Sequence, residues 1–289
     1  MTQVVGKIRL ACSPWLNHGW HVALYVTARG LTTSQIPHGG RWFRIDFDLV
    51  DHRLVITCDG GGERVLPLAA GTIAHFFSAT MDALETLGLP VRINTLPNEV
   101  ADPVRFPDDR RPRPYDPVAV TRFHTALAHA DRVFARFRTG FVGKASPVHF
   151  FWGSFDLAVT RFSGRRAPPH PGGVPGLPDA VTREAYSHEV SSAGFWPGSD
   201  AYPRAAFYSY AYPVPHGFAE AAVAPAAARF DAGLGEFLLD YDEVAAVPDP
   251  DAALLAFLQS TYAAAADRGG WDRDALDRPI GGLGKPGAF

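Results

Sequence analysis

A histidine and an aspartate occupy matching positions in two parts of this sequence and are the strongest candidates for chemistry. His21 stands in Trp-His-Val-Ala and Asp156 in Phe-Asp-Leu-Ala, so each has an alanine two positions later. Residues i and i+2 share one face of a strand, and a small alanine leaves space for a ligand beside the polar side chain. A carboxylate can fix the tautomer of an imidazole that acts as a general base. We therefore predict that His21 and Asp156 act together in a cleft.

Two more histidines, His149 and His188, are candidates for the same acid–base chemistry. A strand expected over 185–190 places His188 on the face opposite to Glu189, where it is either a hydrogen-bonded core residue or the polar point of a pocket. Metal binding is a third interpretation, although ligand sets need three or four donors in a defined geometry. The residues that would form such a metal site are His18, His21, His149 and His188.

The remaining candidates would bind the body of a ligand rather than react with it. Aromatic rings stack on planar groups, and an arginine can clamp a carboxylate or phosphate with two hydrogen bonds. Aromatic clusters are more often part of a core, and arginines more often form surface pairs. The predicted ligand-binding residues are Trp20, Tyr25, Trp152, Arg161, Glu189 and Trp196.

Composition narrows the class of protein. The formal net charge of the 289-residue chain is −3, which makes nucleic acid a poor partner. Hydrophobic residues make up 47% and charged residues 20%, so a large core can form. No nucleotide-binding glycine motif, HExxH motif or GxSxG motif is present, and the sequence identifies no cofactor.

The cellular compartment expected for the protein follows from the absence of a disulfide framework, a secretory signal and a membrane span in its sequence. Two cysteines are too few for a disulfide framework. The N-terminus does not resemble a secretory signal, and no stretch approaches the ~18 uninterrupted apolar residues of a membrane span. We therefore expect a cytoplasmic protein that does not bind membranes.

The elements that must position these residues alternate between strands and helices. Strand-like runs are rich in β-branched and aromatic residues, and three amphipathic segments recur at helical spacing. Expected strands cover 20–27, 42–49, 54–59, 65–68, 91–96, 148–152, 155–162, 185–190, 206–212 and 236–241. Expected helices cover 70–87, 118–138 and 251–268.

Self-comparison indicates two related halves. The segment from Ser13-Pro14 resembles that from Ser146-Pro147, and the helix at 70–87 aligns with the helix at 251–268. The predicted fold class is α+β, with two similar halves that are each a mainly antiparallel sheet backed by helices. The predicted parts are residues 1–97, a proline-rich connector at 98–117, and residues 118–289 with a loosely ordered tail. A possible internal duplication would place a ligand cleft between the halves.

Long, unusual motifs also support a family assignment. The segments at 13–21, 147–158, 186–198 and 207–213 resemble an uncharacterised bacterial family, a domain of unknown function, over about residues 8–277. The resemblance implies one full-length unit in a bacterial cytoplasm and no assigned activity, so function depends on the residues. The leading hypothesis is a small-molecule enzyme that uses histidine and aspartate for acid–base catalysis. The alternatives are a non-catalytic protein that binds a small ligand and a metal protein with histidine ligands; oligomeric state and substrate stay open.

Overall fold

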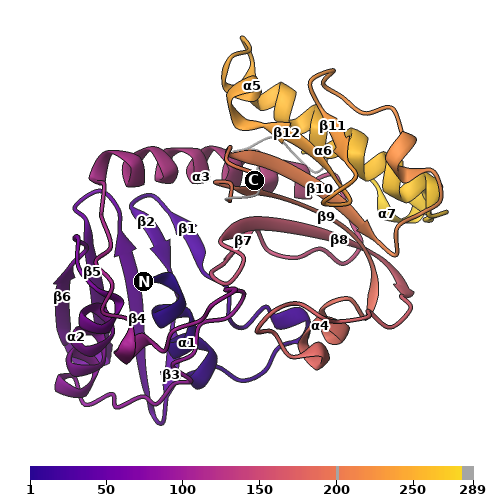
Figure 1. Ribbon diagram of the computed structural model, residues 1–289. Coiled ribbons are helices and arrows are strands. Elements are labelled where there is room, and N and C mark those ends of the chain that lie inside the picture. The colour runs from indigo at the N-terminus through magenta and orange to yellow at the C-terminus, as the bar shows by residue number, and fades with distance from the viewer. Residues whose placement is uncertain (200–201, 282–289) are drawn as a thin grey trace, which may run out of the picture. The chain divides into compact units, whose positions relative to one another are not determined.

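The computed structural model describes residues 1–199 and 202–281 and contains two antiparallel sheets of six strands each (Figure 1). These sheets and the helices that accompany them confirm the predicted α+β class with two similar halves. The chain forms two compact units. The first consists of residues 1–128, 150–154 and 171–184, and the second of the described residues within 129–149, 155–170 and 185–289.

The sheet of the first unit has the strand order β1-β2-β4-β5-β6, with β3 paired to β4. On its long strand, alternate residues Phe43, Ile45 and Phe47 are buried, as the alternating sequence predicts. The strands are β1 (Tyr25–Thr27), β2 (Gly30–Thr32), β3 (Ile36–His38), β4 (Arg41–Asp48), β5 (Arg53–Cys58) and β6 (Glu63–Pro67).

Helices α1 (Thr2–Cys12) and α2 (Ile73–Thr86) belong to the same unit. The hydroxyl of Thr72 caps α2 by accepting a hydrogen bond from the His75 amide at 3.1 Å. Gly88 follows α2 with φ +70°, a conformation that favours glycine after a helix. Helix α1 was not predicted, and its residues Val4, Val5 and Ile8 are fully buried.

The sheet of the second unit has the order β11-β12-β10-β9-β8-β7. The strands are β7 (His149–Phe151), β8 (Asp156–Arg166), β9 (His188–Trp196), β10 (Ala206–Tyr212), β11 (Arg229–Asp231) and β12 (Glu236–Asp240). The remaining helices are α3 (Pro117–Arg138), α4 (Asp179–Ala185), α5 (Tyr241–Ala245), α6 (Pro250–Arg268) and α7 (Arg273–Leu276). Single 3-10 turns lie at Asn17–Gly19, Asp59–Gly61, Phe106–Asp108 and Phe218–Glu220.

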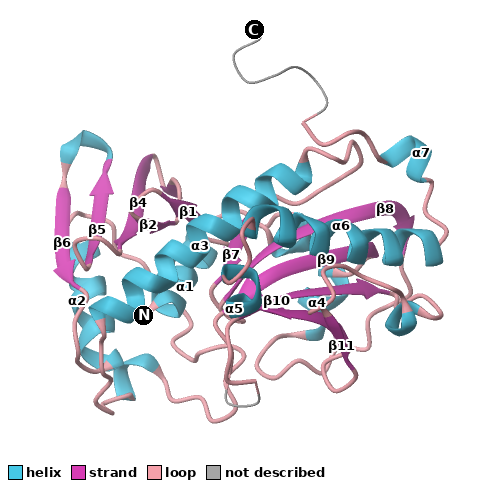
Figure 2. Cartoon of the chain, turned by 90° about the horizontal axis from the view of Figure 1, so that it is seen from above, coloured by secondary structure: helices cyan, strands magenta, loops and turns pink. Residues whose placement is uncertain are grey.

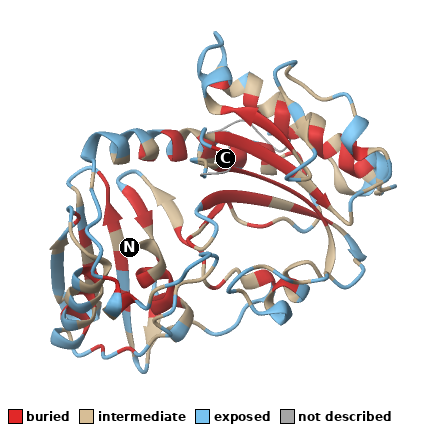
Figure 3. Cartoon of the chain, viewed as in Figure 1, coloured by how far each residue is buried: buried red, intermediate tan, exposed pale blue. Residues whose placement is uncertain are grey.

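The two faces of this second sheet differ in chemistry. Helix α6 packs against β9 and β10, as Figure 2 shows from above, and Phe134 of α3 lies edge-on to Phe207 with centroids 6.3 Å apart. The face toward these helices is mostly apolar and includes Leu157 and Phe195. The central strands are therefore largely buried (Figure 3). The opposite face carries most of the polar side chains of these strands.

One predicted strand is absent, and two others begin later than predicted. Of residues 20–27, only Tyr25–Thr27 form a strand, because His18 (φ +60°) and Gly19 (φ +70°) make a turn that the following residues complete. Residues 91–96 form no strand. Residues 185–187 end α4 and turn into β9, which starts only at His188.

Two further features qualify the predicted halves. Helix α7 lies in the segment that was expected to be a loosely ordered tail, and residues 282–289 of that tail lie outside the described part. The strand orders of the two sheets differ, so the halves resemble one another in class and not strand by strand. Within the described residues, no helix combines the length and apolar character that crossing a bilayer requires.

Candidate functional site

The residues best placed for chemistry lie on the face of the second sheet that points away from α6. Cross-strand partners share a face, and the register pairs Tyr208 with Gly194 on one side and Leu238 on the other. Counting in steps of two along each strand adds further polar residues to that face. We call the group Asp156, Ser192, Tyr208, Tyr210 and Glu236 the tyrosine–carboxylate face.

Asp156 and Tyr208 form the most buried contact of this face. The hydroxyl of Tyr208 donates a short hydrogen bond to the Asp156 carboxylate; Asp156 is 7% exposed and Tyr208 is 8% exposed. Gly194 makes the contact possible, since a Cβ atom there would lie 2.3 Å from the Tyr208 hydroxyl. Burial and the Asp156 charge raise the pKa of Tyr208 well above 10, so this phenol stays a donor.

A chain of hydroxyl groups extends from Tyr210 in the same face. The Tyr210 hydroxyl lies 2.7 Å from the hydroxyl of Tyr186 and also bonds to Ser192. The Ser192 hydroxyl in turn lies 2.8 Å from that of Thr160. The rings of Tyr208 and Tyr210 are nearly parallel, with an interplanar angle of 17° and centroids 6.0 Å apart. The face therefore combines aromatic rings with a row of oxygen atoms.

Glu236 is positioned by a tight hairpin between β11 and β12. The Asp231 carboxylate accepts hydrogen bonds from the amides of Gly233 and Leu234 at 2.9 and 3.0 Å, as aspartates often do at turns. Gly235 closes the turn with φ +75°, where a side chain would be strained. This geometry sets Glu236 directly opposite Asp231 in the ladder.

The carboxyl group of Glu236 is half-buried and makes no hydrogen bond or ion pair with any described residue. Burial is the largest cause of its raised pKa, and the negative charges of Asp156 and Asp231 add to it. Together they raise the pKa of Glu236 from 4.5 to about 7. Glu236 can therefore gain and lose a proton near neutral pH.

The nearby carboxylate of Asp240, unlike that of Glu236, is compensated by arginine side chains. Asp240 accepts hydrogen bonds from Tyr202 and from Arg204 at 2.9 Å, and Arg229 lies 3.4 Å away. Arg229 also donates to the hydroxyl of Tyr202. These arginines serve Asp240, so neither forms an ion pair with Glu236.

This arrangement sets up two carboxyl groups with different environments on one sheet face. Asp156 is buried and accepts a hydrogen bond from the phenol of Tyr208. Glu236 has like charges and low solvation, which favour its protonated form below neutral pH. A carboxyl group whose pKa is shifted toward neutrality by burial and nearby charges is typical of acid–base sites.

Of the predicted catalytic residues, Asp156 belongs to this face and His21 belongs to the first unit. His21 is not in a strand, so the alternation that assigned its direction does not apply. Its Nδ1 accepts a hydrogen bond from the Leu16 amide at 3.2 Å, and its ring lies 4.7 Å from that of Trp15. Burial lowers the pKa of His21, and the Arg9 charge lowers it further. Its joint action with Asp156 stays a prediction.

His149 and His188 each begin a strand of the second sheet, β7 and β9. His149 is only 1% exposed, and His188 Nδ1 lies 3.1 Å from the hydroxyl of Ser187. In the part of the chain that the structure describes, no group of three or more histidine, cysteine, aspartate or glutamate side chains is arranged to hold a metal ion. The histidine metal site therefore gains no support.

Three of the predicted aromatic ligand-binding residues lie in the first unit. The ring of Trp20 lies 5.2 Å from His18, and Tyr25 stacks under the Arg9 guanidinium at 5.3 Å. Trp152 is a core residue, since it is 7% exposed, donates to the Val22 carbonyl at 2.8 Å and packs on Gly6 of α1.

Arg161 and Trp196 occupy opposite faces of the second sheet. Arg161 points toward the helices, 1% exposed, with its guanidinium 3.5 Å from the ring centre of Phe137 and 4.3 Å from that of Tyr262. This box of rings explains its burial and lowers its pKa to about 10 by desolvation. Trp196 shares the face of Asp156 and stacks on Tyr202 with centroids 5.8 Å apart.

Glu189 lines a pocket of about 110 Å³ in the second unit, together with Arg268 and Trp271. Its carboxylate is already engaged, because Arg165 donates to it at 2.7 Å and Ser163 at 2.8 Å. Arg165 also donates to the carbonyls of Gly269 and Gly270 after α6. Glu189 therefore joins β9 to the end of α6.

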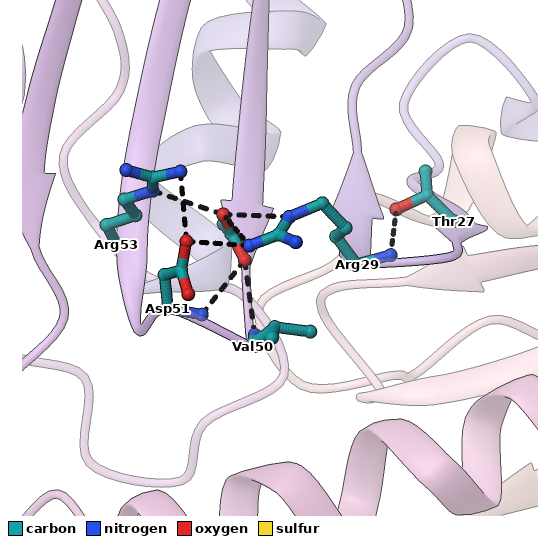
Figure 4. A network of polar contacts seen from close by, with 6 residues as sticks. Thr27, Arg29, Val50, Asp51 and Arg53 are labelled. Carbon is teal, nitrogen blue, oxygen red and sulfur yellow. Dashed lines mark hydrogen bonds and ion pairs between the residues drawn. The ribbon is translucent and has the colours of Figure 1, made fainter.

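A dense polar network of the first unit lies at the turn between β4 and β5 (Figure 4). Figure 4 shows Arg29 and Arg53 approaching Asp51 from two sides, and both arginines also bind Asp48, at 2.9 and 3.1 Å. Burial opposes ionisation of Asp48, but bonds from the Asp51 and Val50 amides and the two arginines lower its pKa to about 2. Every charge is compensated here, which is typical of a structural network.

Four residues of the tyrosine–carboxylate face were not predicted as site residues: Ser192, Tyr208, Tyr210 and Glu236. The strands that hold the last three were predicted at 206–212 and 236–241, so the direction of these side chains could be deduced by alternation. What was missing is the strand pairing, which brings β8, 80 residues away, into the same sheet as β12. The sequence signal was the Asp-Ala-Gly-Leu-Gly-Glu hairpin.

A sequence profile described as a family of unknown function, DUF5996, matches residues 1–278. The match covers nearly the whole chain and both units, which agrees with the full-length resemblance found in the motifs. No curated protein and no solved structure matches the chain.

Proposed function

Because the chain belongs to the DUF5996 family, whose description assigns no activity, we propose a function from its own residues: an enzyme that moves protons to and from a small-molecule substrate at the tyrosine–carboxylate face. In this proposal Glu236 exchanges the proton. Asp156, held by Tyr208, supplies a fixed negative charge beside the substrate. Compared with the histidine–aspartate chemistry expected from the sequence, this proposal retains Asp156 and adds the carboxyl group of Glu236.

The observation that carries the proposal is the raised pKa of a half-buried Glu236 that has no partner among the described residues. A general acid or base works best when its pKa is close to the working pH, and this pKa is about 7. The group is half-buried and free of competing bonds among the described residues, so its proton can pass to a ligand. Perturbed carboxyl groups of this kind cluster at functional sites, although ion-pair networks also produce them. Glu236 forms no ion pair with any residue that the structure describes, which separates it from that second class.

The test is turnover in mixtures of small molecules followed by proton NMR in D₂O. We expect the wild-type protein to convert a component or to exchange one of its protons for deuterium. Glu236→Gln should slow that reaction by about 10²–10⁴-fold, the usual contribution of a general acid or base. Glu243→Gln removes the same charge from an exposed position of the same unit and should leave the rate unchanged.

Two outcomes would contradict the proposal. One is a reaction that proceeds equally fast in Glu236→Gln. The other is a ligand that binds at this face without any turnover, which would support the non-catalytic binding alternative. His21→Ala in the same assay tests whether the histidine takes part, since a reaction that it leaves unchanged assigns the proton transfer to the carboxyl groups alone.

A further inference from the structure

We propose that the tyrosine–carboxylate face binds the primary ammonium group of an organic amine. The inference deepens the proposed function by naming a substrate class, and it rests on the same site. It can nevertheless fail separately, because binding of a cation and transfer of a proton are measured by different experiments.

The first argument is the balance of hydrogen-bonding groups. An ammonium group offers three donors and no acceptor. The face presents the oxygens of Glu236 together with the hydroxyls of Tyr210, Tyr186 and Ser192, which already bond to one another. Carboxylate oxygens only accept when ionised, and hydroxyl groups can both accept and donate. Such a set satisfies an ammonium group better than an anion, which would find few donors.

The second argument is charge. Glu236 and Asp231 are direct cross-strand partners of the same sign, an arrangement that is unfavourable in a sheet. The basic residue on this part of the sheet, Arg229, is held by Tyr202 and Asp240. A half-buried carboxylate without a cation is costly, and an incoming ammonium group would supply the missing charge.

The third argument is the aromatic surface beside the carboxyl groups. Tyr208 and Tyr210 stack almost parallel, and Tyr186 lies 6.3 Å from Tyr210. Ring faces attract cations and cover the carbon skeleton of a ligand. A metal ion is a poorer occupant, since no set of three or more ligating side chains is assembled in the described residues. The combined chemistry selects an amine with an apolar or aromatic body.

The charged and titratable groups that face Glu236 fix how binding should depend on pH. They are Asp231 and Arg229 on β11, Tyr208 and Tyr210 on β10, and Asp156 on β8. On the same face, β9 carries the uncharged Ser192, Gly194 and Trp196 and, at its first position, the titratable His188. Glu236 must be ionised to bind an ammonium group, so affinity should rise with pH and level off above about 7.

Isothermal titration calorimetry with 2-phenylethylamine and 2-phenylethanol tests the inference, because the two probes share a carbon skeleton and differ in charge. We expect the amine to bind at least about tenfold more tightly than the alcohol at pH 8. Its affinity should fall by about tenfold for each pH unit below 7, as expected when one group must lose a proton. Glu236→Gln should abolish both the preference and the pH dependence, whereas Glu243→Gln should behave like the wild type.

Equal binding of both probes, or an unchanged affinity for the amine in a folded Glu236→Gln protein, would overturn the inference. So would absence of amine binding to the wild-type protein at pH 8. The proposed function is tested apart from this: a substrate that lacks an amino group and whose conversion depends on Glu236 would support the enzyme and refute the amine. Amine binding without conversion of any amine would support the amine site and refute the proposed enzyme.

Discussion

Replacing Glu236 by glutamine should stabilise the protein by an amount that grows as the pH rises from about 4.5 to about 7 and is full above that range. The native state raises the pKa of Glu236 from 4.5 to about 7, so it holds the proton more tightly than the unfolded chain does. Between these two pH values the unfolded state loses its proton first. The free energy of unfolding therefore falls as the pH rises from about 4.5 to about 7, and the loss is complete above that range.

The size of this effect follows from the difference between the two pKa values. At about 1.36 kcal/mol per pKa unit, the full difference corresponds to roughly 3 kcal/mol. Because Glu236 is partly exposed and water screens its charge, we expect about 2 kcal/mol. Glutamine has a similar shape and carries no charge at any pH, so Glu236→Gln should be more stable than the wild type by that amount at pH 8 and about equal to it at pH 4.5.

Urea denaturation at a series of pH values measures this difference directly, since the contribution of all other titrating groups cancels between the two proteins. In thermal melts the same gain should raise the midpoint of the second unit by about 4–8 °C at pH 8. Glu243→Gln, at an exposed position, is the matched control and should track the wild type. A Glu236→Gln protein that is equally stable or less stable at pH 8 would refute the argument that this carboxylate is uncompensated.

Three further outcomes follow from other contacts. Tyr208→Phe removes the donor to buried Asp156 and should lower the free energy of unfolding by about 1–3 kcal/mol in urea titrations; no loss would show that the hydrogen bond does not form. Gly194→Ala places a methyl group where the Tyr208 ring lies and should cost about 1–3 kcal/mol, with a shift of the tyrosine signals in NMR spectra. Asp48→Asn should lower the free energy of unfolding by about 2 kcal/mol at pH 7, because the native pKa of Asp48 is about 2 and its ordinary value is 3.8. This loss should shrink as the pH falls from 3.8 toward 2. A loss that does not depend on pH would contradict the prediction.

Local sequence patterns predicted the elements whose burial is regular. The strand over 206–212 coincides with β10, and the strand over 42–49 differs from β4 by one residue at each end. The long helices α3 and α6 begin one residue before their predicted starts, with proline at the first position of each. In these elements the apolar side chains recur with the period of a helix or a strand, so one pattern specifies both the type of secondary structure and the face that is buried.

The prediction failed where backbone conformation overrides side-chain preference. Residues 20–24 are rich in strand-forming side chains, but the positive φ angles of His18 and Gly19 turn the chain just before them. Ala23 and Leu24 are then buried outside a regular strand, and Leu24 forms only an isolated bridge with Phe150. A positive φ at a histidine leaves little trace in the sequence, so alternation along this segment gave a direction for His21 that does not apply.

Of the residues on the candidate site's sheet face, the sequence pointed to one, Asp156. Asp156 was selected because a small alanine follows at i+2, and the structure does place that carboxylate on a polar sheet face. Glu236 was overlooked because its chemistry comes from neighbours that are distant in sequence, and a raised pKa depends on burial and nearby charge rather than on residue type. The role of Gly194 likewise becomes clear only once the strand register places it opposite Tyr208.

The account depends most on the protonation of Glu236, and carbon-13 NMR of the side-chain carboxyl groups measures it directly. The Glu236 signal is assigned as the one that disappears in Glu236→Gln, and its chemical shift is followed from pH 3 to pH 9. We predict a midpoint near 7, well above the ordinary value of 4.5. A midpoint at or below 4.5 would show a solvated or ion-paired carboxylate and would contradict both the proposed proton transfer and the amine site.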